Sequence, residues 1–117
     1  MRCLLLLTLL LAGCGSIRSG LTLDPGATFV LGGEQRGTFH VEILNTGSAT
    51  VRVTEVTVFN DTLAVAVVAQ AETASASFRR GSAALITNLD PVGASLDVRI
   101  TGDTNLGMRS QDAPRGG

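Results

Sequence analysis

An alternation of apolar and polar side chains over residues 38–44 is the pattern that most restricts the fold of this 117-residue chain. Phe39, Val41 and Ile43 are separated from one another by single polar residues. A period of two places the apolar set on one face of an extended chain and the polar set on the other. The sequence therefore predicts a β-strand here, with one face covering a hydrophobic core.

Similar segments recur along the chain, separated by turn-forming residues. The runs DPG at 24–26, NTGS at 45–48 and DPVG at 90–93 predict turns, because proline presets φ and glycine accepts positive φ. Segments with strand character cover residues 21–23, 28–31, 38–44, 51–58, 62–71, 74–78, 83–89 and 96–101. About seven short strands with regular turn signals and no convincing helix predict a β-sandwich or barrel.

The segment at residues 51–58 changes its buried side part-way. Val51 and Val53 would face one way, whereas Val56 and Val58 would face the other. Such a flip without loss of strand character is typical of a β-bulge, which inserts one extra residue. We therefore expect a bulge near Glu55.

Residues 62–71 fit two interpretations. Leu63, Val65 and Val67 alternate, and their β-branched members favour a strand. Four alanines favour a helix, which Asp61 would cap. We expect a strand because the neighbouring segments are strands, and the helix remains the alternative.

Two parts of the chain resemble each other. Residues 36–53 and 80–98 each contain an Arg-Gly pair, a strand, an asparagine and a second apolar strand. Asn45 and Asn88 hold corresponding positions, and we interpret both parts as β-hairpins. An internal repeat and a chance similarity both remain open.

The N-terminus has a different pattern, in which Arg2 precedes an apolar run over residues 3–11. The run is shorter than the roughly 20 residues that cross a bilayer but fits the core of a secretory signal. It leads into four residues that resemble the processing box of bacterial lipoproteins: Leu11, Ala12, Gly13 and Cys14. The resemblance implies cleavage before Cys14, a thioether-linked diacylglycerol on its sulfur and usually an acylated α-amine.

This resemblance also implies a location. The protein would be lipid-anchored in the cell envelope, with its domain periplasmic or surface-exposed. Gly15 after the cysteine favours the outer over the inner membrane in a Gram-negative cell. Three alternatives remain: a misassigned start codon, because residues 1–13 are short for a signal; a buried N-terminal strand or helix; and a soluble periplasmic protein with a fortuitous box.

The predicted organisation has four parts. A signal peptide covers 1–13, lipidated Cys14 and a flexible tether cover 14–20, a β-sandwich domain covers 21–109, and a disordered tail covers 110–117. The mature chain of about 100 residues suffices for one domain. Cys3 leaves with the signal and Cys14 is alkylated, so we expect no disulfide.

Residues 39–53, FHVEILNTGSATVRV, resemble the core hairpin of bacterial immunoglobulin-like modules. Such modules often carry an Asn-Thr-Gly turn between two central strands, as in the cell-surface adhesion-type and abnormal-spindle-type domains. The chain has no tryptophan and so lacks the Cys…Trp…Cys core of antibody domains. The resemblance implies an all-β fold, an immunoglobulin-like antiparallel β-sandwich following a cleaved signal peptide, with a binding or display role.

Residues that could carry chemistry are few. His40 is the only histidine, and Glu42 would share its outward face. A zinc site takes three or four protein ligands and a general base needs positioned partners, so we expect a solvated pair. The alternative function is a small periplasmic metal-binding or enzymatic protein that uses His40 with Glu42. Asp103 and Asn105 have the alternating oxygens of a calcium loop, but no glutamate follows at the required distance.

Composition excludes further classes. Nine basic residues balance ten acidic ones, so no basic stripe indicates a nucleic-acid partner. No glycine cluster precedes a helix, and without Trp or Tyr there is no stacking platform. We expect neither catalysis nor a metal or other cofactor. The expected partners are the membrane, through the lipid on Cys14, and an envelope protein that pairs with an exposed edge strand, for which we favour the strand ending near Ile100.

Overall fold

The computed structural model describes residues 16–103 and 106–111, and this part of the chain contains nine β-strands and no helix. The strands are β1 (Ser16–Leu23), β2 (Thr28–Gly32), β3 (Phe39–Asn45), β4 (Val51–Val56), β5 (Thr62–Val68), β6 (Thr73–Phe78), β7 (Ala83–Asn88), β8 (Ala94–Gly102) and β9 (Met108–Gln111). The predicted all-β class is confirmed, with nine described strands in place of about seven.

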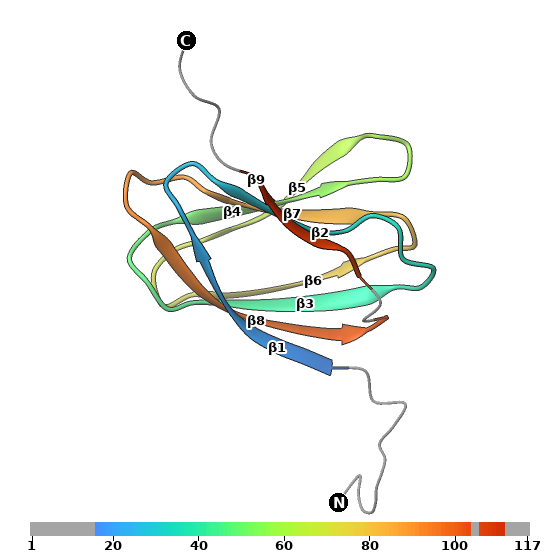
Figure 1. Ribbon diagram of the computed structural model, residues 1–117, viewed down its shortest axis with the longest axis horizontal. Coiled ribbons are helices and arrows are strands. Elements are labelled where there is room, and N and C mark those ends of the chain that lie inside the picture. Colours follow the sequence, from blue (N-terminus) through green and yellow to red (C-terminus); the bar gives the residue numbers. More distant parts are fainter. Residues whose placement is uncertain (1–15, 104–105, 112–117) are drawn as a thin grey trace, which may run out of the picture.

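The strands form two antiparallel sheets that face each other as a sandwich (Figure 1). Sheet A has the order β1-β8-β3-β6, and sheet B has the order β5-β4-β7-β2-β9. Among the described strands, only β4 and β5 follow each other within one sheet, so the other connections cross from sheet to sheet. The predicted antiparallel β-sandwich is thereby confirmed.

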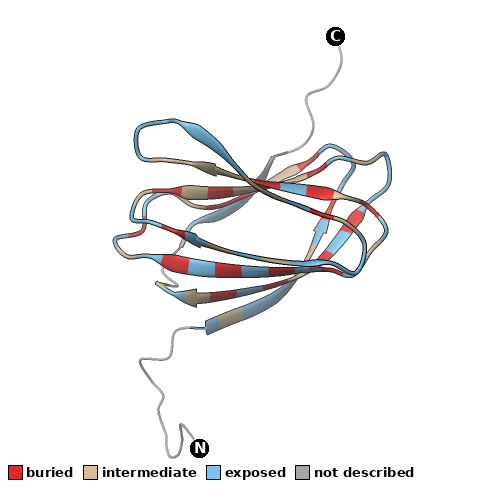
Figure 2. Ribbon diagram, turned by 180° about the vertical axis from the view of Figure 1, so that it is seen from behind, coloured by how far each residue is buried: buried red, intermediate tan, exposed pale blue. Residues whose placement is uncertain are grey.

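The core lies between the sheets and follows the alternation seen in the sequence. In β3, every second residue from Phe39 to Asn45 is buried, and the residues between them are exposed (Figure 2). Phe39 stacks on Phe78 of β6, with ring centroids 5.2 Å apart. Each large side chain buried in this way contributes roughly 1.5–3 kcal/mol.

The predicted hairpins are wrong. β3 and β4 lie in different sheets, and so do β7 and β8, so each asparagine-bearing loop is an arch over the core. The alternation could not separate these arrangements, because Ile43 in sheet A and Val53 in sheet B are both buried. A hairpin and an arch bury the same alternate residues of the two strands that they join.

The described strands contain two units with the same set of neighbours, β1–β4 and β5–β8. Strands β1, β2, β3 and β4 of the first unit correspond in order to β5, β6, β7 and β8 of the second. Under this correspondence, the β1–β8 pair matches β5–β4, the β2–β7 pair matches β6–β3, and the β3–β8 pair matches β7–β4. The match extends to individual backbone hydrogen bonds. Asn88 donates its backbone N–H to Ala27 at 3.0 Å, and Asn45 donates its own to Glu72 at 3.0 Å.

The register of the central strands agrees with this equivalence. Leu96 of β8 lies opposite Asn45, and Val51 of β4 lies opposite Asn88. The similarity between residues 36–53 and 80–98 is therefore part of an internal repeat, in which β3–β4 corresponds to β7–β8. Strand β9 pairs with the outer edge of β2, and no described strand covers the equivalent edge of β6.

The predicted flexible tether is wrong for residues 16–20, which belong to β1 and pair with β8 from Ser16 opposite Thr101 onward. Ile17 and Leu21 pack against the core, while the polar residues between them gave the segment the composition of a linker. The predicted tail is wrong for residues 110–111, which belong to β9 and pair with β2. The rest of the tail, residues 112–117, lies outside the described residues.

The strand interpretation of residues 62–71 is confirmed by β5 (Thr62–Val68), but its faces differ from the expectation. Opposite β4, the register shifts between Val53, which faces Ala66, and Thr54, which faces Ala64. Val65 is therefore the extra residue, and the bulge belongs to β5 instead of β4 near Glu55. Because a bulge changes the side on which later residues lie, the residues before and after it do not share one buried face.

Candidate functional site

The predicted lipidation site lies outside the described residues. This applies to the whole box of Leu11, Ala12, Gly13 and Cys14. The described chain begins at Ser16, and only Gly15 separates Ser16 from Cys14 in the sequence.

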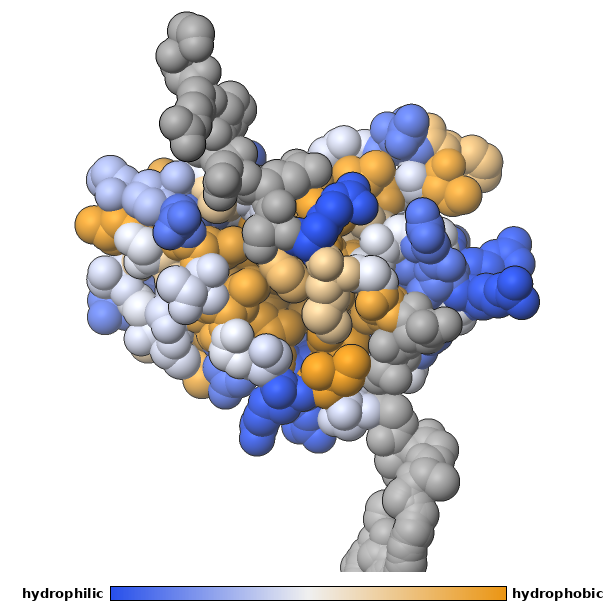
Figure 3. Space-filling model, viewed as in Figure 1, coloured by the Kyte–Doolittle hydropathy of each residue, from blue (hydrophilic) through white to orange (hydrophobic). Residues whose placement is uncertain are grey.

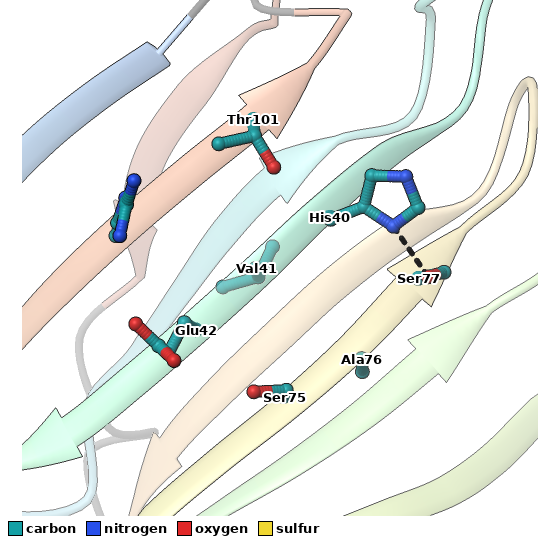
Figure 4. A pocket seen from close by; sticks show the side chains of 8 residues that line it. His40, Val41, Glu42, Ser75, Ala76, Ser77 and Thr101 are labelled. Carbon is teal, nitrogen blue, oxygen red and sulfur yellow. Dashed lines mark hydrogen bonds between the residues drawn. The ribbon is translucent and has the colours of Figure 1, made fainter. Parts of the chain in front are cut away.

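The outer face of sheet A carries the predicted pair His40 and Glu42. Both side chains are exposed and line a shallow hollow of about 380 Å³, together with Val41, Ser75, Ala76, Ser77, Arg99 and Thr101 (Figure 4). The antiparallel register places Ser77 of β6 opposite His40, and its Oγ lies 2.5 Å from His40 Nδ1. This contact could not be predicted from the sequence, because it depends on the pairing of β3 with β6.

The chemistry available in this hollow is limited. Within the described part of the chain, His40 hydrogen-bonds to Ser77 and to no carboxylate, so no third group orients the imidazole. No cluster of three or more His, Cys, Asp or Glu side chains occurs among residues 16–103 and 106–111. Glu42 lies opposite Arg99, which lies opposite Arg18 of β1, so this exposed face carries one acidic and two basic side chains in a row across the strands.

The candidate calcium residues do not form a described site. Asp103 accepts a hydrogen bond from the Gly37 backbone N–H through Oδ2 at 2.9 Å. Its own backbone N–H donates to Thr38 at 3.1 Å. Asp103 therefore holds the loop between β2 and β3, and Asn105 lies outside the described residues.

A buried glutamine connects two loops at one end of the sandwich. Gln35 is 4% exposed, and its Nε2 donates to the backbone carbonyls of Arg79 and Ser82, both at 2.8 Å. Its Oε1 accepts from the Gly33 N–H at 2.7 Å. Both ends of the amide are satisfied, so Gln35 holds the loops together and is not a binding group.

The edge strands are β1 and β6 in sheet A and β5 and β9 in sheet B. The predicted edge strand near Ile100 is wrong, because it is β8, which lies between β1 and β3. Of the two edges of sheet A, β6 has the sequence TASASF, without charge or proline, whereas β1 contains Arg18. Charged residues and prolines are the usual means by which proteins keep an edge strand from pairing, so β6 is the more open of the two edges of sheet A to a partner strand.

No protein-family model matches the chain, and no curated protein matches it significantly. In the part of the chain that the structure describes, no helix is long and apolar enough to span a membrane.

Proposed function

We propose that this protein is a lipid-anchored component of the bacterial cell envelope, whose β-sandwich serves a binding or structural role without catalysis. The observation that carries the proposal is the lipoprotein-like box directly ahead of a folded domain. The box ends at Cys14, and paired structure begins at Ser16. Two or more acyl chains at Cys14 would anchor the domain stably, at about 0.8 kcal/mol for each buried methylene.

The short spacing defines how the domain would be held. Consecutive Cα atoms are about 3.8 Å apart, so the Cα atoms of Cys14 and Ser16 lie within about 8 Å of each other. Strand β1 is fixed to β8 from Ser16 onward. A lipid on Cys14 would therefore hold one end of the sandwich against the membrane, instead of displaying the domain on a long flexible arm. Gly15 favours the outer membrane in a Gram-negative cell.

The binding role is assigned to the free edge of β6. The internal repeat supports this choice, because β9 pairs with the equivalent edge of β2 in the other unit. Backbone hydrogen bonds to a partner strand would supply affinity, and the small side chains of β6 would allow close approach. We propose an envelope protein as the partner, bound by strand addition.

Metabolic labelling tests the anchor. Cells that express the full chain are grown with labelled palmitate, and the protein is isolated from the membrane fraction. We expect label on the natural chain and none on the Cys14→Ser variant, which should also lose its membrane association. Label that persists in Cys14→Ser, or that never enters the natural chain, would exclude lipidation at this residue.

A further inference from the structure

The loop between β4 and β5, residues 57–61, forms a well-defined turn at the end of a projecting arm (Figure 1). The Thr57 N–H donates to the Asp61 carbonyl at 2.8 Å, and the Asn60 N–H donates to the Thr57 carbonyl at 2.9 Å. Asn60 has a φ of 67°, in the left-handed region that asparagine tolerates better than most residues. The Thr57 hydroxyl also accepts from the Phe59 and Asp61 N–H groups, at 3.3 and 3.2 Å.

This turn displays two bulky apolar residues to solvent. Phe59 is 83% exposed and Val58 is 66% exposed, more than the other large apolar residues of the described chain. Figure 3 shows hydrophobic atoms at the end of the arm and strongly hydrophilic atoms beside them. Because the backbone bonds hold the turn, the two side chains cannot reach the core without breaking it.

The arm projects from the end of the sandwich at which β1 begins. Ser16 lies opposite Thr101, which lies opposite His40 near the start of β3. In sheet B, Val56 at the base of the arm lies opposite Ala83 at the start of β7.

The loops join these positions at one end of the molecule, which we call the Ser16 end. Gly32 at the end of β2 lies opposite Ala83, and residues 33–38 lead from Gly32 directly to the start of β3. Gln35 in that loop hydrogen-bonds to residues of the loop that leads into β7. The Ser16 end therefore comprises the start of β1 and the loops at 33–38, 57–61 and 79–82.

The loops beside the arm carry exposed charges of both signs. Arg36, Arg79, Arg80 and Glu34 are exposed in these loops, and Asp61 is exposed in the turn of the arm itself. Arginine guanidinium groups pair well with phosphate oxygens, so three of them around an apolar tip suit a surface of phospholipid headgroups.

We propose that Val58 and Phe59 insert into the surface of the bilayer that holds the acyl chains of Cys14. This inference rests on the proposed lipid anchor, which places the Ser16 end at the membrane through a single intervening glycine. The membrane then contacts the domain at two points, the lipid at the start of β1 and the apolar tip between β4 and β5. Two contacts fix the orientation of the sandwich, so that the strands run away from the membrane and the edge of β6 remains accessible.

Tryptophan fluorescence in vesicles tests the insertion. The chain has no tryptophan, so Phe59→Trp gives a single probe at the tip. Val92→Trp is the matched control, because Val92 is 50% exposed in the arch between β7 and β8, at the opposite end of the strands. Each full-length variant is expressed with its signal, isolated as the palmitate-labelled membrane form, and reconstituted into phosphatidylethanolamine–phosphatidylglycerol vesicles with or without brominated acyl chains. Thermal unfolding first shows that both variants fold.

We expect the emission of the Phe59→Trp variant to shift to the blue in vesicles and to fall by at least half with brominated lipid, while the Val92→Trp variant keeps the emission of an exposed indole. Equal quenching of the two variants, or no quenching of the tip probe in labelled protein, overturns this inference and leaves the lipid anchor standing. Protection of the tip probe in native membranes but not in protein-free vesicles would identify a protein as the occupant and also overturns it. Failure of both chains to take up palmitate overturns the anchor, and this inference with it.

Discussion

Asn45 and Asn88 make the same hydrogen bonds in the two arches that join the sheets. Asn45 Nδ2 donates to the carbonyl of Ala49 at 2.6 Å, and its Oδ1 accepts from the Gly47 N–H at 3.0 Å. Asn88 Nδ2 donates to the carbonyl of Val92 at 2.7 Å, and its Oδ1 accepts from the N–H two residues later at 2.9 Å. Each amide thus shapes its own loop from inside the core.

Replacing either asparagine with alanine should destabilise the domain strongly and to a similar extent. Asn45→Ala leaves the carbonyls of Ala49 and Val68 without their side-chain donor, and Asn88→Ala does the same at Leu23 and Val92. An unsatisfied buried polar group costs about 1–3 kcal/mol, so we expect losses of about 2–4 kcal/mol in the free energy of unfolding.

Urea unfolding measures these losses, and Ser48→Ala is the control because Ser48 is exposed in the first arch. The control should change stability by less than about 0.5 kcal/mol. If either asparagine variant matched the control, the arch bonds would not contribute as described.

Gly26 and Ala71 provide a second comparison between the two units. They occupy equivalent turns, after β1 and after β5, and have φ values of 76° and 68°. Alanine is strained at positive φ by roughly 1–2 kcal/mol, whereas glycine is not. Ala71→Gly removes this strain but also gives the unfolded chain more conformational entropy, which offsets part of the gain. We therefore expect the variant to stabilise the domain by about 0.5–1 kcal/mol.

Gly26→Ala should have the opposite sign and destabilise the domain by about 1 kcal/mol. Paired thermal and urea unfolding of the two variants checks this. Changes of the same sign in both would contradict the equivalence of the turns.

The sequence predicts the strands of this fold better than their partners. From Phe39 to Ile43 in β3 and from Ala94 to Ile100 in β8, every second residue is apolar and buried, so propensity and pattern agree. The pattern carries no information on which strands pair, so the arches were mistaken for hairpins and β8 for an edge. It also missed residues 16–20 of β1, where only Ile17 packs against the core and the neighbouring residues are polar or glycine.

The same limit applies to the candidate sites: the side on which a residue lies could be predicted from its own strand, whereas its contacts with another strand could not. The outward position of His40 and Glu42 followed from the alternation, and the structure confirms it. The contact of His40 with Ser77 could not be predicted, since it depends on the register between β3 and β6. The sequence pattern predicts Val58 as the last residue of a strand, whereas the structure places it with Phe59 in an exposed turn, because alternation alone does not show where a strand ends.

Charge placed on β6 should prevent strand addition. Ser75 is exposed on this edge strand, and Ser75→Lys introduces the kind of residue that blocks edge pairing. Thr22→Lys on β1 is the matched control, since Thr22 is also exposed on an edge of sheet A. Both variants should retain the stability of the natural chain to within about 0.5 kcal/mol.

Crosslinking in native membranes, followed by isolation of the protein, measures the effect on partner binding. We expect a crosslinked envelope protein with the natural chain and with Thr22→Lys, and its loss with Ser75→Lys. A crosslinked species that survives Ser75→Lys would place the partner elsewhere on the domain.

His40→Ala tests the alternative of a metal-binding or enzymatic protein. Because His40 is exposed and its imidazole hydrogen-bonds to the exposed Ser77, we expect a change in stability of less than about 0.5 kcal/mol. Metal analysis of the isolated protein and the phenotype of cells that carry the variant should match those of the natural chain. Loss of a bound metal, or a phenotype equal to that of a deletion, would favour the alternative.

Mass spectrometry of the N-terminal peptide tests the central claim most directly. The proteolysed membrane form should yield a peptide that begins at Cys14, carries the added mass of a diacylglycerol on its sulfur and lacks residues 1–13. A peptide with an intact Met1 and an unmodified Cys14 would contradict the anchor, the orientation at the membrane and the role assigned to the Ser16 end.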